Sequence, residues 1–315
     1  MTAVVSKEVT AKIFGVDDAH PDWCGGCGDF GILSAVKQAL AKLGRPPHEI
    51  AVISGIGCAG KLPHYIGTYG LHTLHGRALN VATGVKLANQ NLEVLVAGGD
   101  GDGYGIGAGY FVNSGRRNVD FAYLVHNNGV YGLTKGQAAP TMQRGMQTKA
   151  MAEPSIQSSV NPIGLAIASG YTFVARGYAM AQADLVDLIV QAIQHRGTAV
   201  LDILQPCPIY NDFMTVDFFK GSDIGSQRVY KLAEEGFDGR VQDPGNEDEI
   251  VLKQQAAIAK SFEWGDRIPT GVLYQIELPT YEDGLASRRS ELASRSLLEL
   301  MEPGKDVSGL EDMYR

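Results

Sequence analysis

The sequence lacks several features that would assign it to a class at once. The 315-residue chain has no apolar run long enough to span a membrane, and Lys7, Glu8 and Lys12 interrupt the N-terminus where a signal peptide would be apolar. It has no long basic run and its formal net charge is −8, so nucleic acid and acidic membrane surfaces are poor candidates as partners. We therefore expect a protein of the reducing cytoplasm, without disulfides and without a membrane or nucleic-acid partner.

Cysteine is scarce too, since the chain has only four. Two lie in the string WCGGCG of residues 23–28, one in GIGCAG of residues 55–60, and one in QPCP of residues 205–208. Four thiolates are the ligand set of one [4Fe-4S] cluster, and glycine lets the backbone approach a cluster and donate N–H groups to its sulfurs. The pattern favours one shared site for Cys24, Cys27, Cys58 and Cys207.

The cysteines alone leave three alternatives open, namely a structural zinc site, a thioredoxin-like redox pair and four unrelated buried thiols. Zinc modules usually pair two local Cys-x-x-Cys knuckles, whereas Cys58 and Cys207 are isolated in the sequence. A thioredoxin-like pair should follow a strand, but residues 16–22 are mixed and polar.

Strand-like and helix-like segments alternate along residues 1–210, which we predict to be one α/β domain. We expect helices over 30–43 (with Asp29 as its cap), 76–89 and 179–195, and buried strands over 50–53, 92–97, 121–125, 171–174 and 199–204. This alternation predicts a doubly wound parallel sheet with helices on both faces. Because ligands bind beyond the carboxyl ends of such strands, the loops that carry Cys58, Asp100, Asn128 and Cys207 should meet there.

Residues 211–315 have a different character. Their charge is higher, 218–249 lacks clear periodicity, and 287–301 is amphipathic at helical spacing. We interpret this segment as a C-terminal arm, either solvated or packed on a partner subunit.

The glycine-rich loop after the strand at 92–97 carries a set of oxygen ligands. Asp100 offers a carboxylate, Asn128, 28 residues later and after the next strand, offers an amide oxygen, and the Val130 carbonyl can supply a third ligand. Such oxygens suit Mg²⁺, and the surrounding glycines leave room for a diphosphate near the start of a helix. The Gly-Asp-Gly string alone could be a turn, but the spaced asparagine makes the magnesium interpretation stronger.

Two longer strings carry a resemblance to a known family. They are GGDGDGYGIG at residues 98–107 and HNNGVYGLTKGQ at residues 126–137. Together with the cysteine placement, they resemble the β subunit of a 2-oxoacid:ferredoxin oxidoreductase, of the 2-oxoglutarate type, over about residues 20–210. The resemblance implies a thiamine-diphosphate-binding fold.

The resemblance also implies ligands and cofactors. The cluster would be [4Fe-4S], held by Cys24, Cys27, Cys58 and Cys207, and Mg²⁺ would be held by Asp100, Asn128 and the Val130 carbonyl. The residues implied to contact thiamine diphosphate are Ile56, Gly57, Ala59, His75, Gly76, Gly101, Asp102, Tyr131, Gly132, Leu133 and Thr134.

The implied reaction is oxidative decarboxylation of a 2-oxoacid to an acyl-coenzyme A, or the reverse, with ferredoxin exchanging the electrons. The family takes the glutamate that activates the aminopyrimidine ring from a partner α subunit, which implies an αβ or (αβ)₂ assembly. Lys61, Leu133 and Lys135 are the residues we tie to substrate choice, because two cations could pair with the second carboxylate of 2-oxoglutarate.

Several alternatives to this function remain. The lysines could be solvent residues or coenzyme A contacts, in which case the enzyme would be of the broad-specificity or pyruvate type. A non-redox thiamine-diphosphate enzyme would need a longer chain and no gathered cysteines. A non-catalytic iron–sulfur or zinc-binding electron carrier would leave Asp100 and Asn128 without a role.

Overall fold

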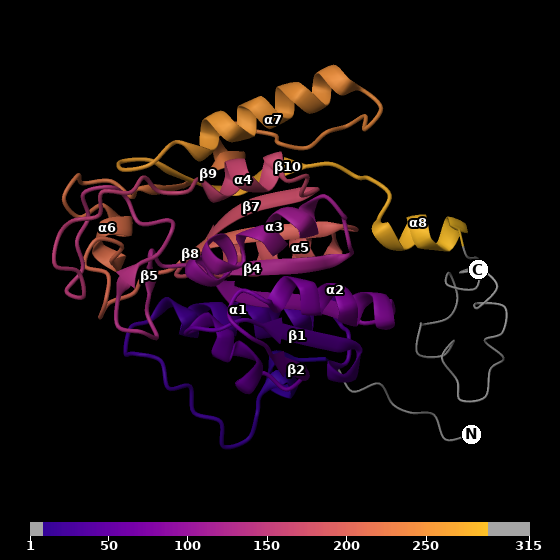
Figure 1. The fold of residues 1–315 in the computed structure, drawn as a ribbon, viewed down its shortest axis with the longest axis horizontal. Coiled ribbons are helices and arrows are strands. Elements are labelled where there is room, and N and C mark those ends of the chain that lie inside the picture. Colours follow the sequence, from indigo (N-terminus) through magenta and orange to yellow (C-terminus); the bar gives the residue numbers. More distant parts are fainter. Residues whose placement is uncertain (1–8, 289–315) are drawn as a thin grey trace, which may run out of the picture.

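An eight-stranded sheet forms the centre of the computed structural model, which describes residues 9–288 (Figure 1). Its order is β2-β1-β3-β4-β8-β7-β10-β9, and all neighbours are parallel except β10, which runs antiparallel to β7. The strands are β1 (Ile50–Ser54), β2 (Tyr69–His72), β3 (Glu93–Gly99), β4 (Phe121–Asn127), β7 (Phe173–Tyr178), β8 (Thr198–Leu204), β9 (Val229–Lys231) and β10 (Ile268–Gln275). A separate hairpin pairs β5 (Val130–Tyr131) with β6 (Gln137–Ala138).

Helices cover both faces of the sheet. On one face, α1 (Gly28–Leu43) and α5 (Gln182–Gln194) bury an apolar stripe against the central strands. On the other face, α2 (Ala78–Ala88), α3 (Ala108–Gly115) and α4 (Pro162–Ala168) form the second core, and α7 (Glu247–Ser261) packs on α4 and β10. Because β4, β7 and β8 are covered on both sides, every residue in them is buried. The prediction of a doubly wound α/β sheet is confirmed.

The helices and strands predicted between residues 30 and 204 are all present, with ends that differ by a few residues. The predicted cap of α1 was wrong, because Cys27 is the residue that precedes the helix and Asp29 lies buried in its first turn. The strand β2 was not predicted, because its four residues are all exposed and therefore give no core pattern. A π-helical segment, η4 (Gly101–Ile106), which follows Asp100 directly, was not predicted either.

The segment predicted as a C-terminal arm contributes β9 and β10 to the sheet, and also contains α6 (Val216–Lys220), α7 and α8 (Tyr281–Arg288). Pro269 and Gly271 lie within β10, and such residues obscure a strand pattern in the sequence. Except for its first two residues, the helix predicted over 287–301 lies outside the described residues. The domain boundary at residue 210 and the packing on a partner subunit stay predictions.

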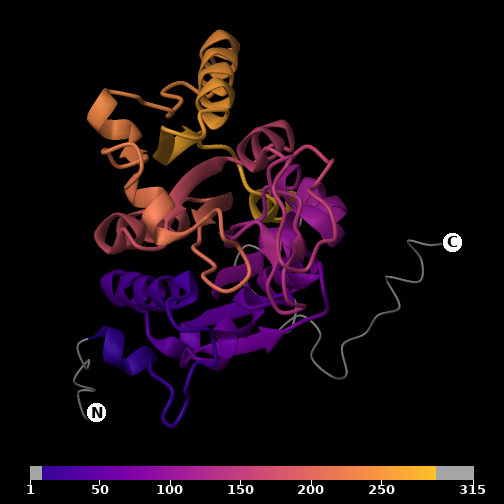
Figure 2. The same cartoon turned by 90° about the vertical axis from the view of Figure 1, so that its left-hand side faces the viewer.

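The loops after the parallel strands gather on one side of the sheet. In Figure 1, β5 and α6, which follow β4 and β8, lie on the left, opposite α8, and Figure 2 turns this side toward the viewer. The loops on this side bring together residues that are far apart in the sequence. None of the helices within residues 9–288 is both long and apolar enough to cross a membrane.

Candidate functional site

A cavity of about 100 Å³ lies beyond the carboxyl ends of β1, β3 and β4. Its lining includes every residue predicted to contact the cofactor except Gly76, as well as the predicted metal ligands Cys58, Asp100, Asn128 and Val130. The backbone N–H of Gly76 donates to Asp102 Oδ1 at 2.8 Å, so this glycine supports the wall from behind. The residues that line the cavity come from loops up to 78 positions apart in the sequence, from Ile56 to Thr134.

Asp100 and Asn128 are held by defined hydrogen bonds. Asp100 is 1% exposed, and its Oδ2 accepts from the N–H of Gly129 at 3.1 Å and from Thr141 Oγ1 at 2.5 Å. Asn128 Oδ1 accepts from the N–H of Val130 at 3.0 Å. Burial raises the pKa of Asp100 to about 7, although the Thr141 hydroxyl opposes the shift.

These residues fit a divalent cation and a diphosphate. Asp100 is a buried carboxylate with no cationic partner among its hydrogen bonds to the described residues, so a bound cation would supply the missing countercharge. The ligand set is one carboxylate, one amide and one carbonyl oxygen, which is chemistry that Mg²⁺ accepts. A side chain at Gly101 would place its Cβ only 2.3 Å from the Tyr131 ring, so the backbone there must stay bare.

Asp102 fixes the opposite wall of the cavity. Its Oδ1 accepts from the N–H of Ile56 at 3.0 Å, from the N–H of Gly76 at 2.8 Å and lies 2.6 Å from His75 Nδ1. One carboxylate therefore joins the loops after β1 and β2 to the start of η4. The role of Asp102 in this structure is to hold the other lining loops in place.

The four cysteines are brought close by three different loops. The N–H of Gly28 donates to the carbonyl of Pro206 at 3.1 Å, which places the Cys24–Cys27 loop against the loop of Cys207. Trp23 Nε1 donates to the carbonyl of Cys58 at 2.9 Å. Cys27 and Cys207 are buried, Cys58 is half-buried and Cys24 is exposed. No strand precedes the Cys24–Cys27 pair between residues 9 and 22, unlike in the thioredoxin-like alternative.

The thiols interact electrostatically. Burial raises the pKa of Cys58 to about 12 and raises the pKa of Cys27 and Cys207 as well, with Asp29 adding to each shift. The Cys207 charge also raises the pKa of Cys27 and Cys58. Across residues 9–288, no three His, Cys, Asp or Glu side chains are arranged as a coordination shell. The loops of the four cysteines are therefore neighbours, although no three of these side chains lie close enough together to share a single metal ion.

A buried hydrogen bond between His126 and Asp29 lies between the cysteines and the cavity. His126 Nδ1 is 2.6 Å from Asp29 Oδ1, both side chains are fully buried, and Asp29 Oδ2 accepts from the Cys27 thiol at 3.4 Å. His126 also lines the cavity, and its Nε2 has no hydrogen-bond partner in the part of the chain that the structure describes. This pair connects a predicted cluster ligand to the wall of the predicted cofactor cavity.

A second network of buried hydrogen bonds reaches Asp100 through Thr141. Arg176 Nε donates to Asp202 Oδ2 at 3.2 Å, and Asp202 Oδ1 accepts from Asn127 Nδ2 at 2.9 Å. Asn127 Oδ1 then lies 2.8 Å from Thr141 Oγ1, which contacts Asp100. The single hydroxyl proton of Thr141 is shared between two acceptor oxygens, so this chain of side chains limits how Asp100 can turn.

The lysines predicted to choose the substrate do not line the cavity. Lys61 Nζ forms an ion pair with Asp22 Oδ2 at 2.8 Å. This hydrogen bond raises the pKa of Lys61, and the carboxylate balances the positive charge of the lysine. Lys135 is exposed and has a left-handed backbone (φ 79°). Leu133, the third predicted residue, does line the cavity.

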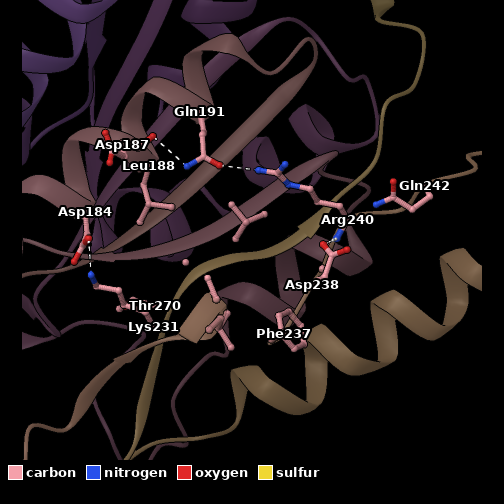
Figure 3. A pocket seen from close by; sticks show the side chains of 15 residues that line it. Asp184, Asp187, Leu188, Gln191, Lys231, Phe237, Asp238, Arg240, Gln242 and Thr270 are labelled. Atoms are coloured by element: carbon pink, nitrogen blue, oxygen red, sulfur yellow. Dashed lines mark hydrogen bonds and ion pairs between the residues drawn. The ribbon is translucent and has the colours of Figure 1, made fainter. Parts of the chain in front are cut away.

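A larger cavity of about 500 Å³ lies elsewhere, between α5 and the strands β9 and β10 (Figure 3). Its charged side chains have partners nearby, as Lys231 Nζ pairs with Asp184 Oδ1 at 2.9 Å and Arg240 Nη2 donates to Gln191 Oε1 at 3.0 Å. The residues that line it include none of those predicted for the site from the sequence.

Several residues of the site were not predicted from the sequence. Asp29, His126 and Gln205 lie within two positions of predicted ligands in the sequence, which was the signal available for them. Arg176 and Asp202 gave a weaker signal, namely charged residues within otherwise apolar strands.

Comparison with known families divides the chain at the carboxyl end of β8. Residues 28–203 match the family model "Thiamine pyrophosphate enzyme, C-terminal TPP binding domain". Residues 207–289 match the family model for the C-terminal part of the pyruvate ferredoxin oxidoreductase beta chain.

Several known proteins are similar to this chain over most of its length. A 2-oxoacid:ferredoxin oxidoreductase subunit beta of Saccharolobus solfataricus is 52% identical over 93% of this chain and 95% of its own. The 2-oxoglutarate oxidoreductase subunit KorB of Mycobacterium tuberculosis is 35% identical over 89% of this chain and 81% of its own. Among solved structures, a 2-oxoglutarate:ferredoxin oxidoreductase from Magnetococcus marinus, with 2-oxoglutarate, coenzyme A and succinyl-CoA bound, superimposes with a TM-score of 0.83 at 35% identity, covering 98% of this chain and 97% of the other.

Proposed function

This chain belongs to the β subunits of the 2-oxoacid:ferredoxin oxidoreductases, and we propose that it holds thiamine diphosphate, Mg²⁺ and one [4Fe-4S] cluster in that enzyme. The reaction is the decarboxylation of a 2-oxoacid, with transfer of the acyl group to coenzyme A. It releases carbon dioxide and two electrons, for which ferredoxin is the acceptor, and a cluster held by the four cysteines would supply the one-electron carrier between them. The reverse reaction is the same chemistry with a reduced ferredoxin as donor.

One observation carries this proposal. The cavity lined by Asp100, Asn128 and Gly101 also contains Cys58 in its wall, so the predicted diphosphate site and cluster site share a boundary. A decarboxylase without redox chemistry has no use for four neighbouring thiols there. An electron carrier without catalysis has no use for the buried carboxylate of Asp100.

The residues that line the cofactor cavity would have separate roles. Asp100, Asn128 and the Val130 carbonyl would hold Mg²⁺, and the bare backbone at Gly101 would admit the diphosphate. Thiamine diphosphate supplies the nucleophilic carbon and electron sink when bound. Leu133, which is 49% exposed at the cavity, would face the substrate.

Cys24, Cys27, Cys58 and Cys207 would hold the cluster. Trp23 would shield it from water, because its ring packs edge-on against Phe30 and Tyr65 with centroid distances of 5.4 and 4.9 Å. A low-dielectric wall of this kind lowers the chance that electrons are lost to solvent species.

We propose 2-oxoglutarate as the preferred substrate, supported by the names of the Mycobacterium relative and the Magnetococcus structure. Lys61 lies outside the cavity wall and pairs with Asp22, so its role would require that pair to open when the second carboxylate arrives. The alternative, a range of 2-oxoacids, is supported by the higher identity to relatives named for 2-oxoacids in general.

An α subunit would complete the active site, since the described residues that line the cavity include no glutamate to activate the aminopyrimidine ring. The assembly would be αβ or (αβ)₂, with its ferredoxin in the cytoplasm. Residues 211–315 would contribute to the interface between the two chains.

Anaerobic EPR of this chain co-purified with its α partner tests the proposal. We expect a reduced-cluster signal after 2-oxoglutarate is added together with thiamine diphosphate, Mg²⁺ and coenzyme A. Two matched variants separate the sites: Cys207→Ser should lose iron but still bind thiamine diphosphate, whereas Asp100→Ala should keep a dithionite-reducible cluster that the oxoacid cannot reduce. Zinc in place of iron, with no signal after dithionite, would refute the proposal. A signal that appears when pyruvate replaces 2-oxoglutarate, but not with 2-oxoglutarate, would refute the proposed substrate.

A further inference from the structure

Gln205 lies between the two predicted metal sites. It follows β8 directly, is 1% exposed, and has hydrogen bonds at both ends of its side-chain amide. Its Nε2 donates to Cys27 Sγ at 3.1 Å, and its Oε1 accepts from Asn128 Nδ2 at 3.2 Å. One side chain thus contacts both a predicted cluster ligand and a predicted magnesium ligand.

The direction of these hydrogen bonds is fixed by a backbone group. The N–H of Val130 can only donate, so Asn128 must present its oxygen to it and its amide NH₂ to Gln205. Gln205 must therefore present Oε1 to Asn128 and Nε2 to the sulfur of Cys27. A flip of either amide would place two donors or two acceptors face to face.

The packing around Gln205 also restricts its side chain. Its backbone N–H donates to the carbonyl of Asn127 at 2.8 Å. A Cβ on Gly28 would lie 2.6 Å from Gln205 Cγ, so the first residue of α1 must be glycine for the side chain to take this path. Gln205 is thus held against the cysteine loop on one side and β4 on the other.

We propose that Gln205 is a positioning residue that couples the cluster site to the magnesium site, an inference that rests on the proposed function. Its N–H···S hydrogen bond stabilises the more negative, reduced cluster and so raises the midpoint potential. Its oxygen accepts from Nδ2 of Asn128 and so fixes that amide with Oδ1 available, which would strengthen Mg²⁺ binding. Loss of Gln205 therefore weakens two properties that are measured separately.

The test uses the complete enzyme with its α partner and compares Gln205→Met with Gln182→Met. Gln182 Nε2 donates to the carbonyls of Gly31 and Ala179 at 3.1 and 2.8 Å, so this control removes a partly buried amide beside α1 without touching a cysteine sulfur. We expect Gln205→Met to lower the equilibrium constant for one-electron reduction about tenfold, which is about 59 mV in an EPR redox titration. We also expect about tenfold more Mg²⁺ for half-saturation of thiamine diphosphate binding.

The two measurements must both change in Gln205→Met and neither in Gln182→Met. If only one changes, or neither, the coupling role of Gln205 is overturned. If the unsubstituted enzyme has no cluster or does not bind thiamine diphosphate, the proposed function itself has failed, which is a different result.

A measurement on the unsubstituted enzyme keeps the inference testable if the variants do not assemble. Enzyme labelled with ¹⁵N in the glutamine side-chain amide should show a ¹⁵N coupling to the reduced cluster in pulsed EPR. Absence of that coupling would refute the hydrogen bond to Cys27, because Gln205 Nε2 is the glutamine side-chain nitrogen that contacts a cysteine sulfur within residues 9–288.

Discussion

Replacing Asp202 by asparagine should destabilise the fold strongly. Asp202 is 1% exposed and is the carboxylate that pairs with Arg176, whose side chain is 3% exposed. Asp202→Asn leaves the guanidinium buried without a countercharge, and it can set an NH₂ group against that of Asn127. Removal of one partner from a buried pair costs about 3–5 kcal/mol.

This cost converts to a change in melting temperature. An unfolding entropy of about 2.1 cal/mol/K per residue gives about 0.66 kcal/mol/K for 315 residues, so the melting temperature should fall by about 5–8 °C. Thermal unfolding of the β chain at fixed concentration, followed by circular dichroism, measures it.

Two variants provide the controls for Asp202→Asn. Asp187→Asn breaks the Lys42–Asp187 pair, which is 58% and 61% exposed, and should change stability by no more than about 1 kcal/mol. The double variant Arg176→Met with Asp202→Asn removes the buried charge and should recover most of the loss. Equal melting temperatures for Asp202→Asn and Asp187→Asn would refute the reasoning.

Three further predictions concern the site itself. Because burial raises the pKa of Asp100 to about 7 and Mg²⁺ binds the ionised carboxylate, half-saturation of thiamine diphosphate binding should need about tenfold more Mg²⁺ at pH 6 than at pH 8; a flat profile would contradict this. Without the cation, stability has the opposite pH dependence. A carboxyl pKa raised by folding favours the fold at low pH, and that stability is lost as pH rises from the ordinary carboxyl pKa to about 7. Lys61→Met should raise the KM for 2-oxoglutarate but not for pyruvate, and an unchanged ratio of the two KM values would exclude the substrate role. Gly55→Ala places a Cβ 1.9 Å from Asp102 Oδ2 and should weaken thiamine diphosphate binding at least tenfold, as measured by calorimetry. The control is Gly84→Ala, which lies in α2 with open space around the new Cβ; it should raise the stability of the fold by about 1 kcal/mol and leave binding unchanged.

The parts of the fold that the sequence predicts well are those with a local signal. The strands β1, β3, β4 and β8 that support the site are mainly apolar runs. Parallel strands place their carboxyl ends at one edge, so the meeting of Cys58 with Asp100 follows from the sequence pattern. The pattern of β10 was hidden by Pro269 and Gly271, and its partner β7 is almost a hundred residues away.

The supporting hydrogen bonds of the site could not be predicted for a related reason. Asp29 pairs with His126 across 97 positions of sequence and Gln205 reaches Cys27 across 178. Nothing in the neighbourhood of either residue indicates which distant atom it will contact. Such pairings depend on how α1 sits on the sheet, which periodicity does not specify.

The antiparallel strand β10 has a consequence for how this chain must be made. The outer edge of β7 can be paired only after residues 268–275 have left the ribosome, so for most of synthesis a buried-type strand has an unpaired edge. Long-range pairing of this kind is slow, and an open apolar edge favours aggregation while it lasts. A chain truncated before β10 should therefore be insoluble, even though it retains every residue that lines the predicted cofactor cavity. Pairing of β10 with β7 is the late event that closes this edge of the sheet within the same chain.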